Sequence, residues 1–235
     1  MSPKTQASPK EARAQILARI RSSLGATPDD TARQAAVAAR LKSSKPHLIP
    51  DRVAKPGTDL PALLRSFLEG QSATVVTVTA PADVPSAVAN FLRASNLPQR
   101  VRMGEDPFLA KLNWSSEPTL ERRQGRARPE DEVGLSHATV AVAETGTLVL
   151  TSGDANPVTL NFLPETHIVV LTAKDIVGPY ETAFERVRTT YGRGIMPRTV
   201  NFISGPSRTG DIGGKLVMGA HGPRRMCVIV VDTAE

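Results

Sequence analysis

The chain has 235 residues and a formal net charge of +6, with 40% hydrophobic and 4% aromatic residues. This length and hydrophobic content allow one large folded domain and exclude a chain that is disordered throughout. The few aromatic side chains disfavour a stacking platform for single-stranded nucleic acid. The single cysteine, Cys227, excludes an intrachain disulfide, and also an iron–sulfur cluster held by this chain alone.

The excess positive charge lies in residues 1–50, which contain nine Lys and Arg but only three Asp and Glu. Residues 51–235 contain equal numbers of acidic and basic side chains. Such a basic arm can contact an acidic protein face, acidic lipid or nucleic acid, or it can be a solvated helical surface. The spacing of the charges favours the solvated surface over a binding role.

Two helices are predicted in this arm. Ser8, Pro9 and Glu11 match a capping box with proline at the first helical position, and Gly25 follows the last apolar residue. A second, Ala-rich helix is predicted to begin at the cap Thr27 and to continue through "TARQAAVAARLK". The stretch "SSKPHLIPDRVAKPG" then predicts a linker, so that we expect an arm over 1–50 and an α/β domain over 51–235.

The elements expected after residue 58 alternate between helix and strand. "DLPALLRSFLEG" and "ADVPSAVANFLRASN" are typical of helices, whereas "ATVVTVT" and "QRVRMG" are typical of strands. This alternation predicts a parallel or mixed sheet with helices on its faces. For 105–135 we expect a short helix near Phe108–Leu112 followed by an irregular connection, with Trp114 against the sheet edge.

The second half is rich in β-branched residues. Two apolar runs in "ATVAVAETGTLVLTSG", together with "HIVVLT", "RTVNFIS" and "MCVIVVD", predict strands. "GPYETAFERVRTTYG" predicts a helix, and Asn156 is expected to cap a short helix that starts at Pro157. Cys227, inside an apolar strand, is expected to be a buried and inert thiol.

Glu144 interrupts an apolar run just before Gly146. It is either a polar residue at a strand junction or a carboxylate that faces a ligand, beside the hydroxyls of Thr145 and Thr147. Gly146 would let backbone N–H groups approach that ligand.

The loop "ISGPSRTGDIGG" follows a predicted strand, and ligands of α/β sheets bind beyond the carboxyl ends of strands. Gly205 and Gly210 permit an anion-binding nest, Arg208 offers a planar fork for carboxylate or phosphate, and Ser207 and Thr209 can donate. Asp211 either holds Arg208 or accepts a ligand hydroxyl. Alternatively, Arg208 and Asp211 satisfy each other in a purely structural loop.

The histidines give no metal site. His221, in "GAHGPRR", is either a general acid or base or a hydrogen-bonded turn residue. His137 and His167 are expected to be structural residues at strand starts. Because the four histidines lack metal-ligand spacing, no metal site is expected. No cofactor is expected either. The phosphate-loop, dinucleotide-binding and nucleophile-elbow patterns do not occur. Without a long apolar run or a signal-peptide core, the chain is expected in the cytoplasm.

Four stretches carry a resemblance to a known family, and they occur in the family's order: "EARAQILARIRSSL", "AVAETGTLVLTS", "LPETHIVVL" and "ISGPSRTGDIGGKLVMGAHGPRRMCVIVVD". On these residues the chain resembles the bacterial LUD-domain family. The resemblance implies a three-layer α/β/α sandwich similar to the NagB, RpiA and CoA-transferase-like group. It also implies a non-redox subunit of a lactate-utilization system, which supports oxidation of L-lactate to pyruvate together with iron–sulfur partner proteins.

The resemblance also assigns motif positions that line a site for a small anionic metabolite. Gly210 and Gly213 stand where relatives often have Ala and Glu, which makes the loop more flexible. The rival interpretation is a stand-alone CoA-transferase-like or sugar-phosphate enzyme with Glu144 as its nucleophile. The motif positions are Glu144, Thr145, Gly146, Gly205, Pro206, Ser207, Arg208, Thr209, Asp211, His221 and Gly222.

Overall fold

The computed structural model describes residues 8–25, 27, 29–43, 48–192, 194–210 and 213–232. The chain divides into two compact units, Met1–Pro46 and His47–Glu235.

The N-terminal unit contains two helices, and no side chain of either helix is buried. α1 spans Pro9–Ser23 and α2 spans Thr31–Lys42. The predicted capping box of α1 is confirmed, since the Glu11 amide donates to Ser8 Oγ and the Ser8 amide donates to the Glu11 carboxylate. The start predicted for α2 at Thr27 is wrong, because the Asp30 carboxylate caps this helix by accepting from the Arg33 amide.

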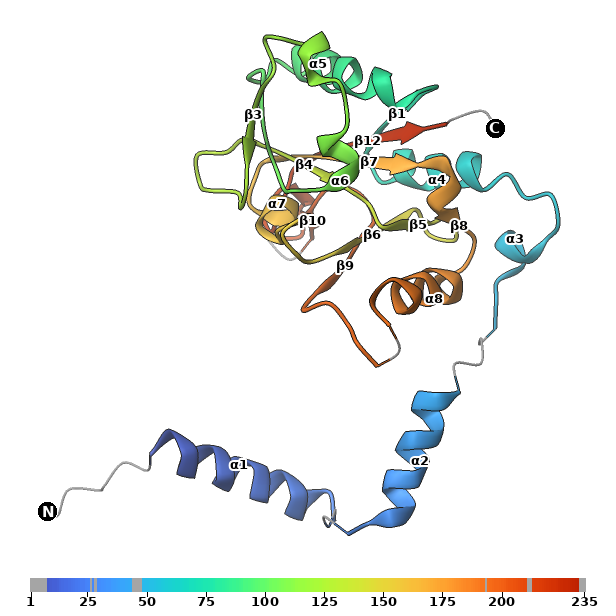
Figure 1. The fold of residues 1–235 in the computed structure, drawn as a ribbon, viewed down its shortest axis with the longest axis vertical. Helices are drawn as coiled ribbons and strands as arrows, with labels where there is room; N and C mark the ends of the chain where they lie inside the picture. Colours follow the sequence, from blue (N-terminus) through green and yellow to red (C-terminus); the bar gives the residue numbers. More distant parts are fainter. Residues whose placement is uncertain are drawn as a thin grey trace, which may run out of the picture. The chain divides into compact units, whose positions relative to one another are not determined.

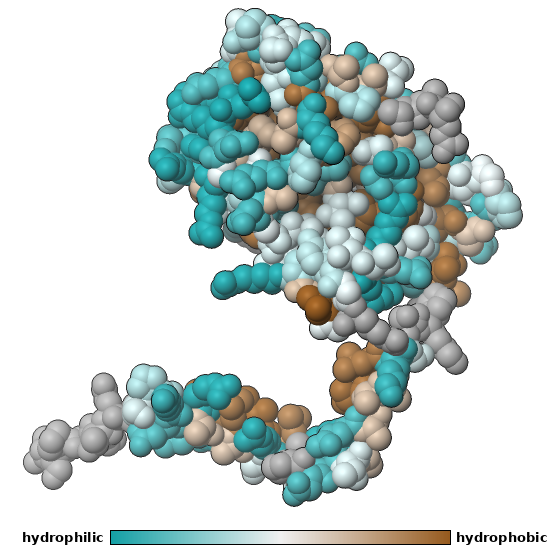
Figure 2. All heavy atoms as spheres, in the orientation of Figure 1, coloured by the Kyte–Doolittle hydropathy of each residue, from teal (hydrophilic) through white to brown (hydrophobic). Residues whose placement is uncertain are grey.

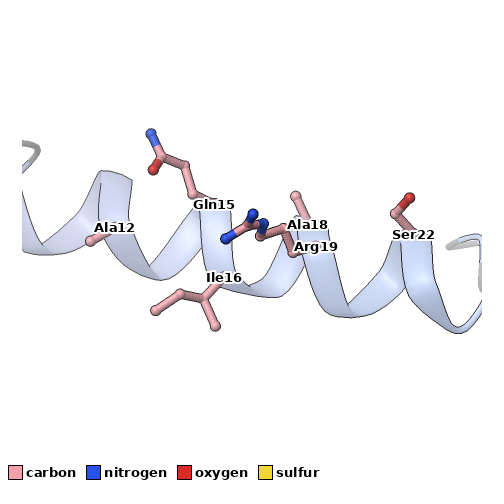
Figure 3. A pocket seen from close by; sticks show the side chains of 6 residues that line it. All are labelled: Ala12, Gln15, Ile16, Ala18, Arg19 and Ser22. Carbon is pink, nitrogen blue, oxygen red and sulfur yellow. The ribbon is translucent and has the colours of Figure 1, made fainter.

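Apolar side chains are nevertheless exposed on both helices. Figure 2 shows hydrophobic atoms gathered along one side of α1 and near the C-terminal end of α2. A shallow hollow beside α1 is bounded by that single helix, and Figure 3 shows its side chains pointing to opposite sides of the ribbon. It therefore has no opposing wall and is not a binding cavity. The side chains drawn there are Ala12, Gln15, Ile16, Ala18, Arg19 and Ser22.

A six-stranded parallel sheet forms the centre of the second unit, which confirms the predicted α/β class (Figure 1). Every adjacent pair of strands runs parallel, so all the carboxyl ends meet at one edge. In spatial order the strands are β1 (Thr74–Val78), β12 (Arg225–Val231), β7 (Thr166–Thr172), β4 (Val133–His137), β2 (Arg100–Met103) and β3 (Glu121–Gln124).

The strand order reverses between β2 and β4. The chain crosses from β1 to β2, continues outward to β3, and then returns to β4, β7 and β12 on the other side of β2. Ligands of open α/β sheets bind beyond the carboxyl ends of the strands at such a reversal.

Helices cover one face of this sheet. α5 (Val84–Ala94) places Val84, Val88 and Leu92 in a core with the inward side chains of β2, β4, β7 and β12. Trp114, which was expected against the sheet edge, belongs to this core, and its indole N–H donates to the Leu109 carbonyl.

The opposite face is covered by a helix and by a second sheet. α4 (Leu60–Gly70) buries Leu64 and Leu68 against β7 and β12, beside a four-stranded sheet in the order β8-β5-β6-β9. α8 (Tyr180–Tyr191) packs Ala183 and Val187 on the outer side of that sheet. The strands are β5 (Val140–Val142), β6 (Thr147–Thr151), β8 (Ile176–Val177) and β9 (Val200–Ile203).

The irregular connection expected over 105–135 is wrong, because this stretch contains β3 and β4. β3 reads Glu-Arg-Arg-Gln because it is an edge strand with little to bury. β4 contains Gly134 because the Leu160 carbonyl oxygen lies 2.5 Å from the place of a Cβ. The cap expected at Asn156 is also wrong, since α7 begins at Thr159 and Asn156 is buried.

The remaining elements are short. They are α3 (Asp51–Ala54), α6 (Pro107–Ala110), α7 (Thr159–Phe162), the hairpin strands β10 (Arg208–Thr209) and β11 (Val217–Met218), and the 3-10 turns Pro81–Asp83, Trp114–Ser116 and Ala173–Asp175. No helix of the described residues is long and apolar enough to cross a bilayer.

The buried imidazole of His167 makes stability depend on pH. It lies in β7 with Nε2 3.0 Å from Ser136 Oγ, and burial lowers its pKa to about 3. In the unfolded chain the imidazole takes up a proton below its ordinary pKa of 6.5. Protonation therefore favours the unfolded chain between pH 6.5 and about 3. His167 does not lower the free energy of unfolding above pH 6.5, and it lowers it by up to about 1.4 kcal/mol per pH unit as the pH falls towards 3.

We therefore expect His167→Gln to flatten the fall of the unfolding free energy below pH 6.5. Urea unfolding of the parent and the variant at several pH values between 4 and 7 measures this slope. The same slope in both proteins would show that His167 does not carry the effect.

Candidate functional site

The two stretches singled out in the sequence meet in the structure. Thr147 begins β6, and Ser204 follows β9, which pairs with β6. Thr147 Oγ1 lies 2.6 Å from Ser204 Oγ, so the turn after Glu144 and the start of the 204–210 loop are in direct contact.

Thr147 is the centre of a cluster of four hydroxyls. Its Oγ1 lies 2.7 Å from Thr145 Oγ1 and 2.8 Å from the Tyr180 hydroxyl, which is also 2.8 Å from Thr145. Thr147 is fully buried, so these hydroxyls satisfy one another. Tyr180 was not expected in this cluster, because it comes from α8, 33 residues after Thr147, and no local pattern links the two residues.

Two glycines hold this region against the end of α4. A Cβ on Gly146 would stand 2.5 Å from Phe67 Cβ, and one on Gly205 would stand 2.7 Å from Gln71 Cβ. Both glycines have positive φ, +66° and +106°. The space beside each glycine is thus filled by the protein, and the pair fixes both loops on one helix end.

Glu144 precedes the hydroxyl cluster, and its side chain is mostly buried. Its side chain is 13% exposed, and Oε1 lies 4.0 Å from an Arg52 guanidinium nitrogen. Its amide donates to the Gly178 carbonyl, which fixes the backbone at this position.

The second part of the loop folds against the 219–223 turn. The Ser207 amide donates to the Pro223 carbonyl, the Gly219 amide donates to the Ser207 carbonyl, and the His221 amide donates to Ser207 Oγ at 3.2 Å. A Cβ on Gly222 would stand 3.5 Å from Ser207 Cβ, at ordinary contact distance. Ser207, His221 and Gly222 are therefore brought together, with Pro206 buried beneath.

Arg208 is exposed on β10, opposite Met218 of β11. Among the described residues no carboxylate lies within ion-pair distance of it. Thr209 is buried in the same strand. Asp211, expected either to hold Arg208 or to bind the ligand, lies outside the described residues.

His137 was expected at the start of a strand, and this prediction is wrong, because His137 is the last residue of β4. Its Nδ1 lies 3.3 Å from the Asp106 carboxylate, and its ring stacks on Phe108 with centroids 4.6 Å apart. Burial alone would raise the pKa of Asp106, but the hydrogen bond and charge of His137, with the amides of Leu109 and Phe108, hold that pKa below its ordinary value. The described ranges contain no group of three His, Cys, Asp or Glu side chains that could hold a metal ion.

The chain has the fold of an α/β protein whose parallel sheet is covered by helices on one face and by a helix and a smaller sheet on the other. A solved DUF162 family protein from Deinococcus radiodurans has a similar fold, with a TM-score of 0.55 and 23% identity over 74% of this chain and 96% of that one. The model of the LUD domain matches residues 53–231. The chain belongs to the LUD-domain family.

Curated relatives match a part of the chain. A lactate utilization protein C from Shouchella clausii is 37% identical over 101 residues, which is 43% of this chain and 44% of that protein. One from Geobacillus thermodenitrificans is 34% identical over 119 residues, 50% of this chain and 49% of that protein. The matched segments thus span about half the length of these relatives or less.

Proposed function

We propose that this chain is a non-redox subunit of a lactate-utilization system, and that it supports oxidation of L-lactate to pyruvate together with iron–sulfur partner proteins. The observation that carries the proposal is the LUD domain over 53–231, shared with relatives that are named for lactate utilization. In the proposal the chain divides into a basic helical arm and linker over 1–50 and the LUD α/β domain over 51–235.

The state of Cys227 supports a non-redox role. The thiol is buried in β12, and burial raises its pKa to about 12, so it does not form the thiolate that a cluster requires. In the proposal the redox centres lie on the partners. A free thiol also suits the reducing cytoplasm, where we place the subunit.

The anion site of the proposal is the surface of the 204–210 loop. Arg208 supplies an exposed guanidinium beside the Ser207–His221 contact, and Gly205 ties this loop to α4 and thereby to the Glu144 turn. A planar guanidinium on a fixed backbone suits a small carboxylate such as lactate or pyruvate.

The partners are proposed to bind the arm. Both arm helices expose apolar side chains, which include Ile16, Ile20 and Leu41, among spaced Arg and Lys residues. Helices of 15 and 12 residues are marginal without packing, so an acidic partner surface that covers the apolar side chains would stabilise them.

Two experiments test the proposal. Deleting the gene from its own bacterium should abolish growth on L-lactate but not on pyruvate, and the intact chain should restore it. A tagged chain should co-purify iron-containing partners from cells grown on L-lactate, and deletion of residues 1–45 should abolish this while the remaining domain stays folded. Normal growth of the deletion strain on L-lactate would contradict the function, and unchanged co-purification would contradict docking by the arm.

In the alternative function the Glu144 carboxylate attacks the thioester carbonyl of an acyl-CoA. The carbon–sulfur bond breaks, CoA leaves as the thiolate, and an acyl intermediate forms on Glu144, which returning CoA can convert to a thioester. The observation in its favour is a mostly buried carboxylate beside a guanidinium at the end of a glycine turn. Mass spectrometry after incubation with acetyl-CoA distinguishes the two functions: a covalent adduct on Glu144, absent from Glu144→Gln, would support the enzyme.

A further inference from the structure

A polar hollow of about 600 Å³ lies beyond the carboxyl ends of β2 and β3. Glu105 follows β2 in its wall, and Gly125 and Arg126 follow β3. This edge adjoins the reversal of strand order between β2 and β4, where α/β sheets bind their ligands.

The hollow is separate from the proposed site at Arg208. Its other wall consists of Ser152 and Asp154, which follow β6, and of Arg198 and Thr199, which precede β9. The Glu144 turn precedes β6 and the Arg208 loop follows β9. Since β6 and β9 pair as antiparallel strands, the two sites lie at opposite ends of the same ladder.

Backbone hydrogen bonds fix the walls of the hollow. The Glu105 amide donates to the Asp154 carbonyl at 2.9 Å, and the Ser152 amide donates to the Thr199 carbonyl at 2.9 Å. The Thr199 amide returns a bond to Ser152 Oγ. Gly104 has no room for a Cβ because the Ala155 carbonyl occupies that space. The shape therefore exists before any ligand arrives, which lowers the entropic cost of binding.

The charged groups in the walls do not neutralise one another. Arg126 and Arg198 line the hollow with Glu105 and Asp154, yet in the described part of the chain none of the four forms an ion pair within 4.0 Å. Two guanidinium groups can bind one phosphate or carboxylate through charge-assisted hydrogen bonds. Two carboxylates beside them can accept hydrogen bonds from hydroxyl groups.

We propose that this hollow is a second binding site, which takes a small anion that also carries hydroxyl groups. Arg126 and Arg198 bind the anionic end, and Glu105 and Asp154 bind the hydroxyl groups. The volume is in the range of small-molecule sites, about 300–1,000 Å³, and admits a molecule the size of a sugar phosphate or a sugar acid.

Isothermal titration calorimetry of the full chain tests the proposal, with ribose 5-phosphate and D-gluconate as the probes. At least one probe should bind saturably. Ribose, which lacks the anion, and inorganic phosphate, which lacks the hydroxyl groups, should bind at least tenfold more weakly. Arg126→Gln and Arg198→Gln should each weaken binding of that probe about tenfold or more, as expected for loss of one charge-assisted contact.

The matched control is Arg128→Gln, which makes the same charge change two residues from Arg126 and outside the hollow. Arg128→Gln should bind the probe as tightly as the parent does. Arg208→Gln should also bind the probe as tightly as the parent, and this result would distinguish the second site from the anion site of the lactate-utilization proposal. Because all four arginines are exposed, unchanged thermal midpoints should show that the variants fold. The proposal would be overturned if neither probe binds saturably. It would also be overturned if Arg128→Gln weakens binding of the probe as much as Arg126→Gln and Arg198→Gln do, or if Arg208→Gln abolishes binding while those two variants do not.

Discussion

Asp131→Ala should lower the free energy of unfolding by about 3–5 kcal/mol, because it leaves a buried guanidinium without its partner. Arg102 Nε donates to Asp131 Oδ2 at 2.8 Å, and the two side chains are 9% and 3% exposed. The same carboxylate accepts from the Arg128 amide, and Arg102 also donates to the Gln124 carbonyl. The pair therefore ties β2 to β3 and to the segment that leads into β4.

Urea denaturation measures this loss, and Glu69→Ala is the control. Glu69 pairs with Arg65 at 3.1 Å, but its side chain is 50% exposed, so its loss should cost at most about 0.5 kcal/mol. A similar small cost in both variants would show that the Arg102–Asp131 pair is not a buried anchor of this edge.

The same pair predicts sensitivity to acid. Burial alone would raise the pKa of Asp131, but the Arg102 side chain and the Arg128 amide outweigh burial and hold that pKa below its ordinary 3.8. Because the pKa of Asp131 is depressed in the folded state, its contribution to the free energy of unfolding is present above about pH 3.8. This contribution is lost as the pH falls through the pKa of the folded state.

Gly146→Ala should lower the free energy of unfolding by about 2–5 kcal/mol, through two causes that add. A left-handed φ of +66° costs an L residue about 1–2 kcal/mol. The new Cβ would also stand 2.5 Å from Phe67 Cβ and 3.1 Å from the Leu68 amide nitrogen, and overpacking costs about 1–3 kcal/mol. The loss should loosen the contact between the Glu144 turn and α4.

Gly57→Ala separates these causes. Gly57 has a φ of +81°, but no atom lies within 4 Å of its Cβ position, so only the backbone cost of about 1–2 kcal/mol is expected. Chemical denaturation of both variants gives the difference. Equal losses would show that close packing on α4 does not explain the glycine at 146.

The sequence predicted the elements whose pattern is local. The Ser8 capping box, the apolar strand β12 and the helices α4 and α5 follow from short-range periodicity, and the α/β class follows from their alternation. β3 and β4 were missed because an edge strand shows no apolar alternation, and because Gly134 serves a contact with Leu160 that is distant in the sequence.

The candidate site was predicted only as two separate stretches. Their contact through Thr147 and Ser204 depends on the pairing of β6 with β9. The paired residues are 49 to 55 positions apart in the sequence, so the pairing has no local signature. Tyr180 and the end of α4 complete the region from other elements. The hollow at Arg126 and Arg198 was not foreseen for the same reason, since its walls come from four separate segments.

The central claim is that Arg208 binds a small carboxylate metabolite, and ligand-dependent thermal unfolding of the parent and of Arg208→Ala tests it most directly. A ligand that binds the folded state raises the unfolding midpoint by mass action. L-Lactate or pyruvate should raise the midpoint of the parent and leave that of Arg208→Ala unchanged. No shift with either metabolite, or the same shift in both proteins, would contradict the account.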